Sequence, residues 1–330
     1  MTAKFLILGS NSFSGATFSD YLATEGHEVI ATSRSDEPHD AFLPYKWGKK
    51  EGSVVFHRID LNNDLDALKQ LLEKERPSHV VNFAAQSMVG ESWKNPDHWM
   101  MTNVVSAVRL HELLRNYDGL ERYVHVTTPE VYGSTDGWVG EDTQFNPSTP
   151  YAVSRAAADM SLRTYFTQYG FPVVSTRAAN VFGPGQQLYR IVPRTILFGM
   201  TGQTLQLHGG GASVRSFIDM RDVSDATYRI ATNGKIGETY HISTDRLVSI
   251  RDLVAMIFDK LGCDFEKQVE VVGERAGKDS AYKLASAKVR TELGWDSKVS
   301  LEQGIDETVE WAKRFENTLI ATDPNYVHKP

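Results

Sequence analysis

Short apolar runs alternate with longer stretches of helical periodicity through the first half of the chain. An uninterrupted apolar run is typical of a strand covered on both faces of a parallel sheet, and a longer amphipathic stretch after it is typical of a crossover helix. The predicted strands are Lys4–Leu8, Glu28–Thr32, Val54–Arg58, His79–Phe83, Arg122–Val126 and Pro172–Thr176, and the predicted helices lie near Ser14–Glu25, Asp64–Glu75, Pro96–Arg115 and Pro150–Tyr169. This order predicts an α/β fold with a Rossmann-type doubly wound parallel sheet.

The pattern changes in the second half of the chain, where glycine, proline and glutamine gather in a loop and short mixed elements follow. We expect residues 1–180 to form the sheet domain and residues 215–243 to return to it. Residues 181–214 and 244–330 are expected to form a smaller mixed α/β lobe. Such a lobe would stand over the carboxyl ends of the strands, where open α/β sheets bind their ligands.

Composition narrows the class of protein. The chain has 330 residues, 41% of them hydrophobic, with 35 basic and 42 acidic side chains and a net charge of −7, which fits a folded protein of two domains. The acidic balance argues against a nucleic-acid surface but allows a pocket for one nucleotide. Cys263 is the single cysteine, the ten histidines show no metal-ligand spacing, and we expect no metal. With no signal peptide and no apolar stretch of about 18 residues, we expect a cytoplasmic protein without a membrane span.

A glycine-containing loop joins the first predicted strand to the first predicted helix. Gly9 and Gly15 are six residues apart, and backbone without side chains can approach a pyrophosphate whose charge the helix amino end favours. The residues predicted to bind a dinucleotide here are Gly9, Asn11, Ser12, Phe13, Ser14 and Gly15. Ser12 stands where a strict fingerprint has a middle glycine, so the motif alone also fits a tight turn without a ligand. With its context, it predicts that residues 1–180 are a dinucleotide-binding domain.

The end of the second strand carries information on which dinucleotide is bound. A carboxylate at this point hydrogen-bonds the ribose hydroxyls and repels a 2′-phosphate. This chain has Ser33 and Arg34 there and no carboxylate, and a guanidinium beside hydroxyls is suited to a phosphate. The sequence therefore predicts NADP in preference to NAD, with Arg34 as a solvated loop residue the alternative.

Tyr151 and Arg155 lie one turn apart near the start of the helix that begins at Pro150. A cation on the same helix face favours the phenolate, so the pair could supply a general base, although it could also be a chance surface pair. Thr128 and Glu130 follow the fifth strand, at the same edge of the sheet.

Taken in order, these motifs resemble the extended short-chain dehydrogenase/reductase superfamily and, within it, the sugar-nucleotide 4,6-dehydratases. The resemblance runs nearly from end to end, and its motifs are Gly9–Gly15, Asp60-Leu61, Asn82–Gln86, Thr128–Gly133, Tyr151–Arg155, Arg177–Pro184, Arg215–Asp222, Glu274–Asp279 and Leu293–Trp295. It implies that Asp60, Leu61, Ala84, Ala85, Tyr151 and Arg155 join the glycine loop, Ser33 and Arg34 in binding the cofactor.

The resemblance also implies a reaction in which the tightly bound cofactor is recycled. Tyr151 would take the proton of the sugar's 4-hydroxyl as hydride leaves carbon 4, and Thr128 would bond that oxygen. Glu130 would remove the proton on carbon 5, water would leave carbon 6, and hydride would return there. The product would be a 4-keto-6-deoxy sugar nucleotide, and Arg155 completes the implied catalytic set.

Two departures from the family pattern affect the chemistry. Arg155 replaces the usual lysine and presents a planar fork, which changes its ribose contacts. Pro129 replaces an aspartic acid that many relatives use to protonate the leaving hydroxyl. Glu130 could pass on the proton it collects, or a water held by Thr128, Gln86 or Ser87 could supply one.

The same resemblance assigns the sugar-nucleotide site and the assembly. Its residues are Gln86, Ser87, Asn180, Gln186, Arg190, Arg215 and Arg275, with the two last arginines clamping the diphosphate. The most similar branch is bacterial and dehydrates GDP-N-acetylglucosamine in legionaminic acid biosynthesis, a route to cell-surface glycans. The helices near 96–115 and 150–169 correspond to those through which relatives dimerise, so a homodimer is expected.

Two other functions fit part of the same pattern. A sugar-nucleotide 4-epimerase or decarboxylase shares the fold and Tyr151, and a cofactor-binding regulator would explain Pro129 and Arg155 as loss of the site. The presence of Thr128, Glu130 and Tyr151 together favours an active dehydratase.

Overall fold

Seven parallel strands form the central sheet of the computed structural model, which describes residues 3–135, 137–273 and 283–330. Their order is β11-β7-β5-β4-β1-β2-β3, with bounds β1 Lys4–Leu8, β2 Glu28–Ser33, β3 Ser53–Arg58, β4 His79–Asn82, β5 Arg122–Val126, β7 Val173–Ala178 and β11 Thr239–Ile242. Every pairing in this sheet is parallel. The order turns back at β1, as in a doubly wound sheet, and the predicted fold class is confirmed.

Alternate residues of each central strand enter opposite cores. Phe5 and Ile7 of β1 pack with α1 (Phe13–Thr24) and α8 (Met220–Asn233). Leu6 and Leu8 pack on the other face with α2 (Leu65–Glu75), α5 (Ala107–Arg115) and α6 (Pro150–Tyr169). All four side chains are fully buried, which explains why the strand is apolar without alternation.

The predicted helix near 96–115 has a break in its periodicity. It consists of α4 (Pro96–Met100), a π-helical segment at Met101–Ser106, and α5. The extra residue per turn directs Asn103 inward, where its amide donates to the Gln86 carbonyl at 2.9 Å and to the Ser154 hydroxyl at 2.9 Å. A π segment of this kind is frequent at functional sites.

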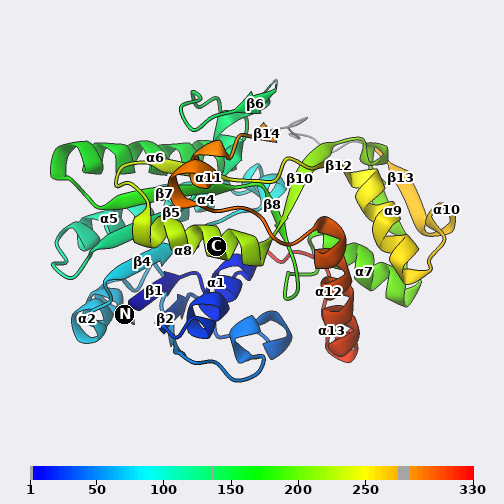
Figure 1. The fold of residues 1–330 in the computed structure, drawn as a ribbon, viewed down its shortest axis with the longest axis horizontal. Coiled ribbons are helices and arrows are strands. Elements are labelled where there is room, and N and C mark those ends of the chain that lie inside the picture. The colour runs from blue at the N-terminus through cyan, green and yellow to red at the C-terminus, as the bar shows by residue number, and fades with distance from the viewer. Residues whose placement is uncertain (1–2, 136, 274–282) are drawn as a thin grey trace.

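The second group of elements forms a smaller lobe, at the right of Figure 1. Its core joins α7 (Ile191–Thr201), α9 (Ile250–Leu261), α12 (Leu301–Arg314) and α13 (Glu316–Ala321). A three-stranded sheet in the order β12-β10-β8 connects the lobe to the main sheet. The remaining strands and helices are β6 Trp138–Val139, β8 Asn180–Phe182, β9 Leu205–His208, β10 Val214–Asp219, β12 Leu247–Ser249, β13 Val269–Val272, β14 Lys283–Leu284, α3 Val89–Ser92, α10 Phe265–Gln268 and α11 Ala287–Leu293.

The segment 214–242 is divided between the two groups of elements. β10 pairs with β8 and β12, whereas α8 packs on the main sheet and β11 becomes its edge strand beside β7. None of the described helices is long and apolar enough to cross a bilayer.

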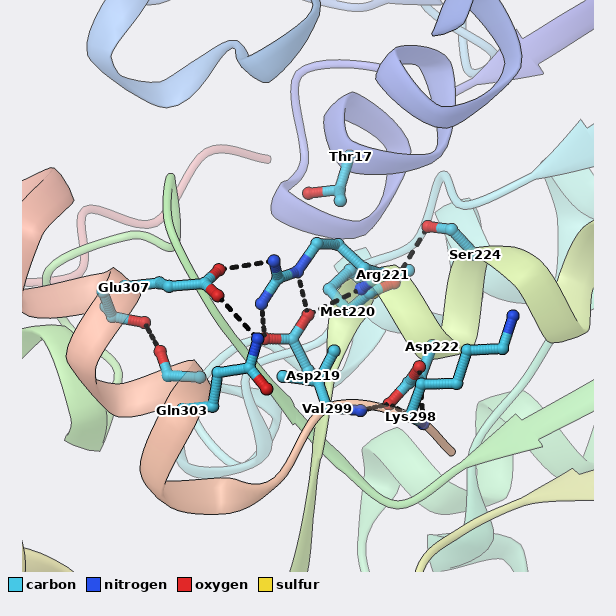
Figure 2. A network of polar contacts seen from close by, with 12 residues as sticks. Thr17, Asp219, Met220, Arg221, Asp222, Ser224, Lys298, Val299, Gln303 and Glu307 are labelled. Carbon is cyan, nitrogen blue, oxygen red and sulfur yellow. Dashed lines mark hydrogen bonds and ion pairs between the residues drawn. The ribbon is translucent and has the colours of Figure 1, made fainter. Parts of the chain in front are cut away.

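A polar network links the lobes where β10 runs into α8 (Figure 2). Arg221 donates to both carboxylate oxygens of buried Asp219, at 2.8 and 2.9 Å, and also pairs with Glu307 of α12. Asp222 accepts from the backbone N–H groups of Lys298 and Val299 at 3.0 Å. The network therefore fixes α12 of the smaller lobe against the start of α8.

Candidate active site

A cleft of about 790 Å³ opens along the carboxyl ends of the central strands. Most of the site residues predicted from the sequence line it: Gly9, Asn11, Ser12, Phe13, Ser14, Ser33, Arg34, Asp60, Leu61, Ala84, Ala85, Gln86, Ser87, Thr128, Glu130, Tyr151, Arg155, Asn180, Gln186 and Arg190. Its volume lies within the usual range for small-molecule sites. The fold thus brings together residues that lie as far apart in the sequence as Gly9 and Arg190.

The turn between β1 and α1 requires glycine at both ends. Gly9 has φ +83°, and a Cβ on it would lie 2.6 Å from the Ala84 backbone nitrogen. A Cβ on Gly15 would lie 2.3 Å from the Gly9 carbonyl oxygen, so Gly15 packs behind the turn rather than lining the cleft. Ser12 caps α1 by accepting from the Gly15 N–H at 3.1 Å, which leaves other amino-end N–H groups available for an anion.

Asn11, in the turn after β1, connects this turn to the segment after β2. Its amide donates to the carbonyls of Ser35 and Asp36 at 2.8 and 3.0 Å. Its Oδ1 is buried and has no hydrogen-bond partner among the described residues. Arg34, beside it, donates to the backbone carbonyls of Lys329, at 3.2 Å, and Pro330.

The β3 end of the cleft is shaped by Asp60. Its carboxylate accepts from the Asn62 N–H and the Asn63 amide, each at 2.9 Å, so it closes its own turn. Leu61 next to it is buried.

These features fit a nicotinamide dinucleotide. The cradle at Gly9 and Gly15 has no space for a side chain, and α1 presents its amino end there. The cleft continues from that cradle to Tyr151, so one extended ligand can contact both ends. An acceptor such as the orphan Asn11 oxygen matches a ribose hydroxyl or water donor.

Thr128, Glu130 and Tyr151 meet at the β5 end of the cleft. Thr128 caps the 3-10 turn Pro129–Tyr132, since its hydroxyl accepts from the Glu130 N–H at 3.3 Å. Tyr151, in the first turn of α6, hydrogen-bonds the Thr128 side chain. The structure therefore places these three residues together, as the sequence predicted.

The pKa of Tyr151 is raised above its ordinary value. Burial is the largest cause and the nearby Glu130 carboxylate is the second, while Arg155, the hydrogen bond with Thr128 and Arg190 act in the opposite direction. The expectation from sequence was that Arg155 favours the phenolate. Its charge does so, but burial and Glu130 outweigh it.

Arg155 points toward the end of β5. Its side chain is buried, and its guanidinium donates to the Val126 carbonyl and lies 3.5 Å from His125 Nε2. Behind it, Asp159 accepts from Arg177 at 2.7 Å and from the Thr127 hydroxyl at 3.1 Å.

This buried cluster of Asp159, His125, Thr127 and Arg177 joins α6 to the strand end that carries Thr128. His125 Nε2 lies 3.2 Å from Asp159 Oδ1. Burial pulls the pKa of the Asp159 carboxyl upward, but the bond with His125 and the charge of Arg177 outweigh it and hold the pKa far below its ordinary value. Asp159 is therefore a carboxylate at neutral pH.

The predicted substrate residues divide into three groups. Asn180, Gln186 and Arg190 line the cleft, and Gln186 donates to the Val181 carbonyl at 2.9 Å. Arg215 lies on β10 and is not among the lining residues; its guanidinium donates to the Val214 carbonyl. Arg275 lies outside the described residues.

Some residues of the site were not predicted from the sequence. Asp159 of the buried cluster could have been predicted from its spacing, because it is four residues after Arg155 and eight after Tyr151. Residues with this spacing lie on one face of a helix. Tyr326, Val327 and Lys329 also line the cleft, and no local motif in the sequence distinguishes them.

Comparison with known proteins places this geometry among nucleotide-sugar enzymes. A family model described as GDP-mannose 4,6 dehydratase matches residues 6–308. The dTDP-glucose 4,6-dehydratase of Xanthomonas campestris is 33% identical over 94% of this chain and 93% of its own. A trifunctional Arabidopsis thaliana protein, named as a UDP-glucose 4,6-dehydratase, 3,5-epimerase and reductase, is 34% identical over 78% of this chain, but the match spans only 39% of that longer protein.

A solved structure shares the same architecture. The dTDP-glucose 4,6-dehydratase DesIV from Streptomyces venezuelae, crystallised with NAD, superposes with a TM-score of 0.87 and 31% identity, covering 96% of this chain and 98% of that one.

Proposed function

The chain belongs to the GDP-mannose 4,6-dehydratase family and is a nucleotide-sugar 4,6-dehydratase that uses a nicotinamide cofactor, and from that premise we propose how its own residues carry the reaction. The observation that carries the proposal is the meeting of Thr128, Glu130 and Tyr151 at one end of the cleft. Gly9, Ser12 and the amino end of α1 hold the cofactor pyrophosphate, with Asp60 and Leu61 toward the adenine.

Tyr151 acts on the 4-hydroxyl of the sugar as the general base, with Thr128 bonded to the same oxygen. A bound nicotinamide supplies the hydride acceptor for carbon 4 and the hydride donor for carbon 6. Arg155 acts on Tyr151 as a fixed buried charge, held by the Val126 carbonyl. Proton transfer by a positioned group typically contributes about 10²–10⁴-fold to a rate.

Glu130 removes the proton on carbon 5 and passes it to the departing 6-hydroxyl, which leaves as water. Glu130 then takes a proton from solvent and returns it to carbon 5 as hydride adds to carbon 6, and the proton that Tyr151 took from the 4-hydroxyl goes to solvent. Pro129 is buried and cannot donate a proton. Among the described residues that line the cleft, the carboxylates are Glu130 and Asp60, and the Asp60 oxygens are engaged in their own turn. One carboxyl group that takes a proton on one step can return it on the next.

Replacing Glu130 by glutamine tests this assignment. The variant is expected to lose solvent deuterium exchange at carbon 5 while still accumulating enzyme-bound reduced cofactor, seen by its absorbance. The matched control is Glu121→Gln, an exposed glutamate at the opposite end of β5. Retained exchange in Glu130→Gln, with the control unchanged, would refute the role of base.

The identity of the sugar nucleotide is a further part of the proposal. We propose GDP-N-acetylglucosamine, on the resemblance of the runs Gly9–Gly15, Thr128–Tyr132, Tyr151–Arg155 and Gly183–Thr195 to the bacterial branch that uses it; the family model, described for a GDP-sugar, is consistent with the base. The test is a panel of GDP-, UDP-, dTDP- and CDP-sugars analysed for loss of 18 mass units. An isobaric product would indicate an epimerase, loss of carbon dioxide a decarboxylase, and no turnover despite cofactor binding a regulator.

The proposed cofactor preference is NADP. Ser33 and Arg34 stand at the end of β2, where a carboxylate would select against a 2′-phosphate. Direct comparison of the affinities for NADPH and NADH tests this, and a clear preference for NADH would contradict it.

We also propose a homodimer through α4, the π segment, α5 and α6. Four exposed apolar side chains lie on these helices: Met101, Val105, Val153 and Met160 are 44, 38, 41 and 62% exposed. A dimer through these helices would cover them. A strictly monomeric mass in solution would refute this.

A further inference from the structure

The carboxyl-terminal segment Pro324–Pro330 runs across the cleft and contacts both lobes. After α13 ends at Ala321, the chain leaves the smaller lobe and returns to the carboxyl edge of the main sheet. Figure 1 marks the end of the chain near the middle of the molecule. The segment thus contacts residues that are far from it in the sequence.

The first contacts of the segment are with the smaller lobe. Arg194 of α7 donates to the Pro324 carbonyl at 2.7 Å and to the Asn325 side-chain oxygen at 2.9 Å. The ring of Tyr326 packs edge-on against Tyr189, with 5.2 Å between centroids. Tyr189 itself lines the cleft, so the segment begins at the sugar side of the site.

The next contact of the segment is with α4 of the main domain. The His328 ring stacks on fully buried Trp99, with 5.1 Å between centroids and 18° between planes. His328 Nε2 also lies 2.8 Å from His98 Nδ1. These contacts fix the segment at a second point.

The last residues reach the loops after β2 and β4, which carry Arg34 of the predicted cofactor site and Gln86 of the predicted sugar-nucleotide site. The Gln86 amide donates to the Lys329 carbonyl at 2.6 Å. The Arg34 guanidinium donates to the same carbonyl at 3.2 Å and to that of Pro330. The Lys329 backbone therefore bridges the ends of β2 and β4, on either side of β1.

The segment covers the cleft without filling it. The cleft keeps a volume of about 790 Å³ with the segment in place, and Tyr326, Val327 and Lys329 line it together with Gly9, Thr128 and Tyr151. The Val327 side chain is 67% exposed, so it contributes little to the anchoring.

We propose that Pro324–Pro330 forms a strap that completes the cofactor site and slows cofactor release. The inference rests on the proposed function in one respect, the nicotinamide cofactor. A dehydration in which hydride leaves and returns leaves the cofactor unchanged, so the enzyme has no need to exchange it between turnovers. A covering element anchored on both lobes would retain it.

The size of the effect follows from the contacts. Each net hydrogen bond that holds the strap closed changes the release rate by about fivefold, and three bonds join the strap to Gln86 and Arg34. Removing the strap is therefore expected to speed cofactor release by at least about tenfold.

The experiment compares the full chain with a variant that ends after Asp323, and adds His328→Ala with Ile320→Ala as its control, since Ile320 lies on α13, is 53% exposed and is not among the residues that line the cleft. Each protein is loaded with NADH or NADPH in the absence of any sugar nucleotide. It is then diluted into excess oxidised cofactor, which does not fluoresce, and the rate at which the fluorescence of the bound reduced cofactor decays is measured. For whichever cofactor binds more tightly, we expect release to be at least about tenfold faster from the truncated chain and several-fold faster from His328→Ala. Ile320→Ala is expected to match the full chain.

Unchanged release from both altered chains would overturn the proposal. Tighter cofactor binding after truncation would also overturn it, because the segment would then be a competitor for the site. If the truncated chain does not fold, the comparison of His328→Ala with Ile320→Ala decides the matter. Since the readout needs no substrate, a strap effect without sugar-nucleotide turnover would refute the dehydratase mechanism and leave the strap intact.

Discussion

Replacing Asp159 by asparagine tests whether the buried cluster behind Arg155 holds α6 to the end of β5. Asp159 accepts from Arg177 at 2.7 Å and from Thr127 at 3.1 Å, and the side chains of Asp159 and Arg177 are 6 and 3% exposed. Asparagine has nearly the same shape but carries no charge. The substitution leaves the guanidiniums of Arg155 and Arg177 without this carboxylate.

The expected loss of unfolding free energy follows from the burial of the pair. Removing one partner of a buried ion pair typically costs about 3–5 kcal/mol, because the remaining charge stays desolvated. Asparagine keeps one oxygen as an acceptor, so we expect the lower end, about 3 kcal/mol. A loss of this size is a large part of the roughly 5–15 kcal/mol that stabilises an ordinary folded domain.

The assay is urea unfolding followed by tryptophan fluorescence, for which the chain carries six tryptophans. The matched control is Asp118→Asn. Asp118 also pairs with an arginine, Arg76, at 2.7 Å, but the two side chains are 83 and 52% exposed. The two ion pairs have the same N–O distance but differ in solvent exposure. Because solvent screens the exposed pair, we expect Asp118→Asn to have the same unfolding free energy as the parent chain.

The pH dependence gives a second check on the Asp159 variant. Because the pKa of Asp159 is held far below its ordinary value in the folded chain, its contribution is complete above the unfolded pKa of about 3.9 and is lost only as pH falls below it. The deficit of Asp159→Asn is therefore expected to be constant between about pH 6 and pH 8. A deficit as small as that of Asp118→Asn, or one that disappears on passing from pH 6 to 8, would refute the reasoning.

Three further predictions concern the rest of the fold. Burial and the charge of Arg177 lower the pKa of His241 to about 3. The free energy of unfolding therefore falls as pH drops below about 6.5, the pKa of histidine in the unfolded chain, and at pH 5 this group lowers it by about 2 kcal/mol. His241→Gln is expected to make the urea midpoint less dependent on pH. Gly15→Ala places a Cβ 2.3 Å from the Gly9 carbonyl oxygen, which is expected to cost about 1–3 kcal/mol and to weaken cofactor binding measured by fluorescence titration. Arg221→Ala removes the ion pair to Glu307 of α12, and calorimetry is expected to show lower stability with cofactor affinity unchanged.

The central strands of the main sheet were predictable because they are buried on both faces, whereas the edge strand β3 has no fully buried residue. Predicted and observed strands differ by no more than two residues at either end for β1, β2, β3, β4, β5 and β7. The alternation of β1 between two cores keeps positions 5–8 apolar, and that signal is present in the sequence alone. α6 coincides with its prediction because Pro150 and Gly170 mark its ends, with Gly170 in the left-handed region at φ +64°.

The parts that were not predictable depend on contacts between segments far apart in the chain. Nothing local distinguishes β10, which pairs with β8 and β12, from a strand of the main sheet. The strap is held by carbonyl groups, which every residue has, and by rings from α4 and Tyr189. Its position is a property of the assembled cleft and leaves no pattern in residues 324–330.

The pKa of Tyr151 also depends on contacts that the sequence does not reveal. Helical spacing is enough to place the two side chains on one face of α6, and the sign of their interaction is as expected. The net pKa of Tyr151 is nevertheless raised, because burial and the Glu130 carboxylate, which arrives from the end of β5, outweigh Arg155. The pKa of Tyr151 is therefore set jointly by Arg155 of α6, Glu130 after β5 and Arg190 before α7. One consequence is that neutralising Glu130 also makes the Tyr151 phenolate easier to form, so a Glu130 variant that still transfers hydride but cannot exchange the proton on carbon 5 separates the two steps rather than disabling both.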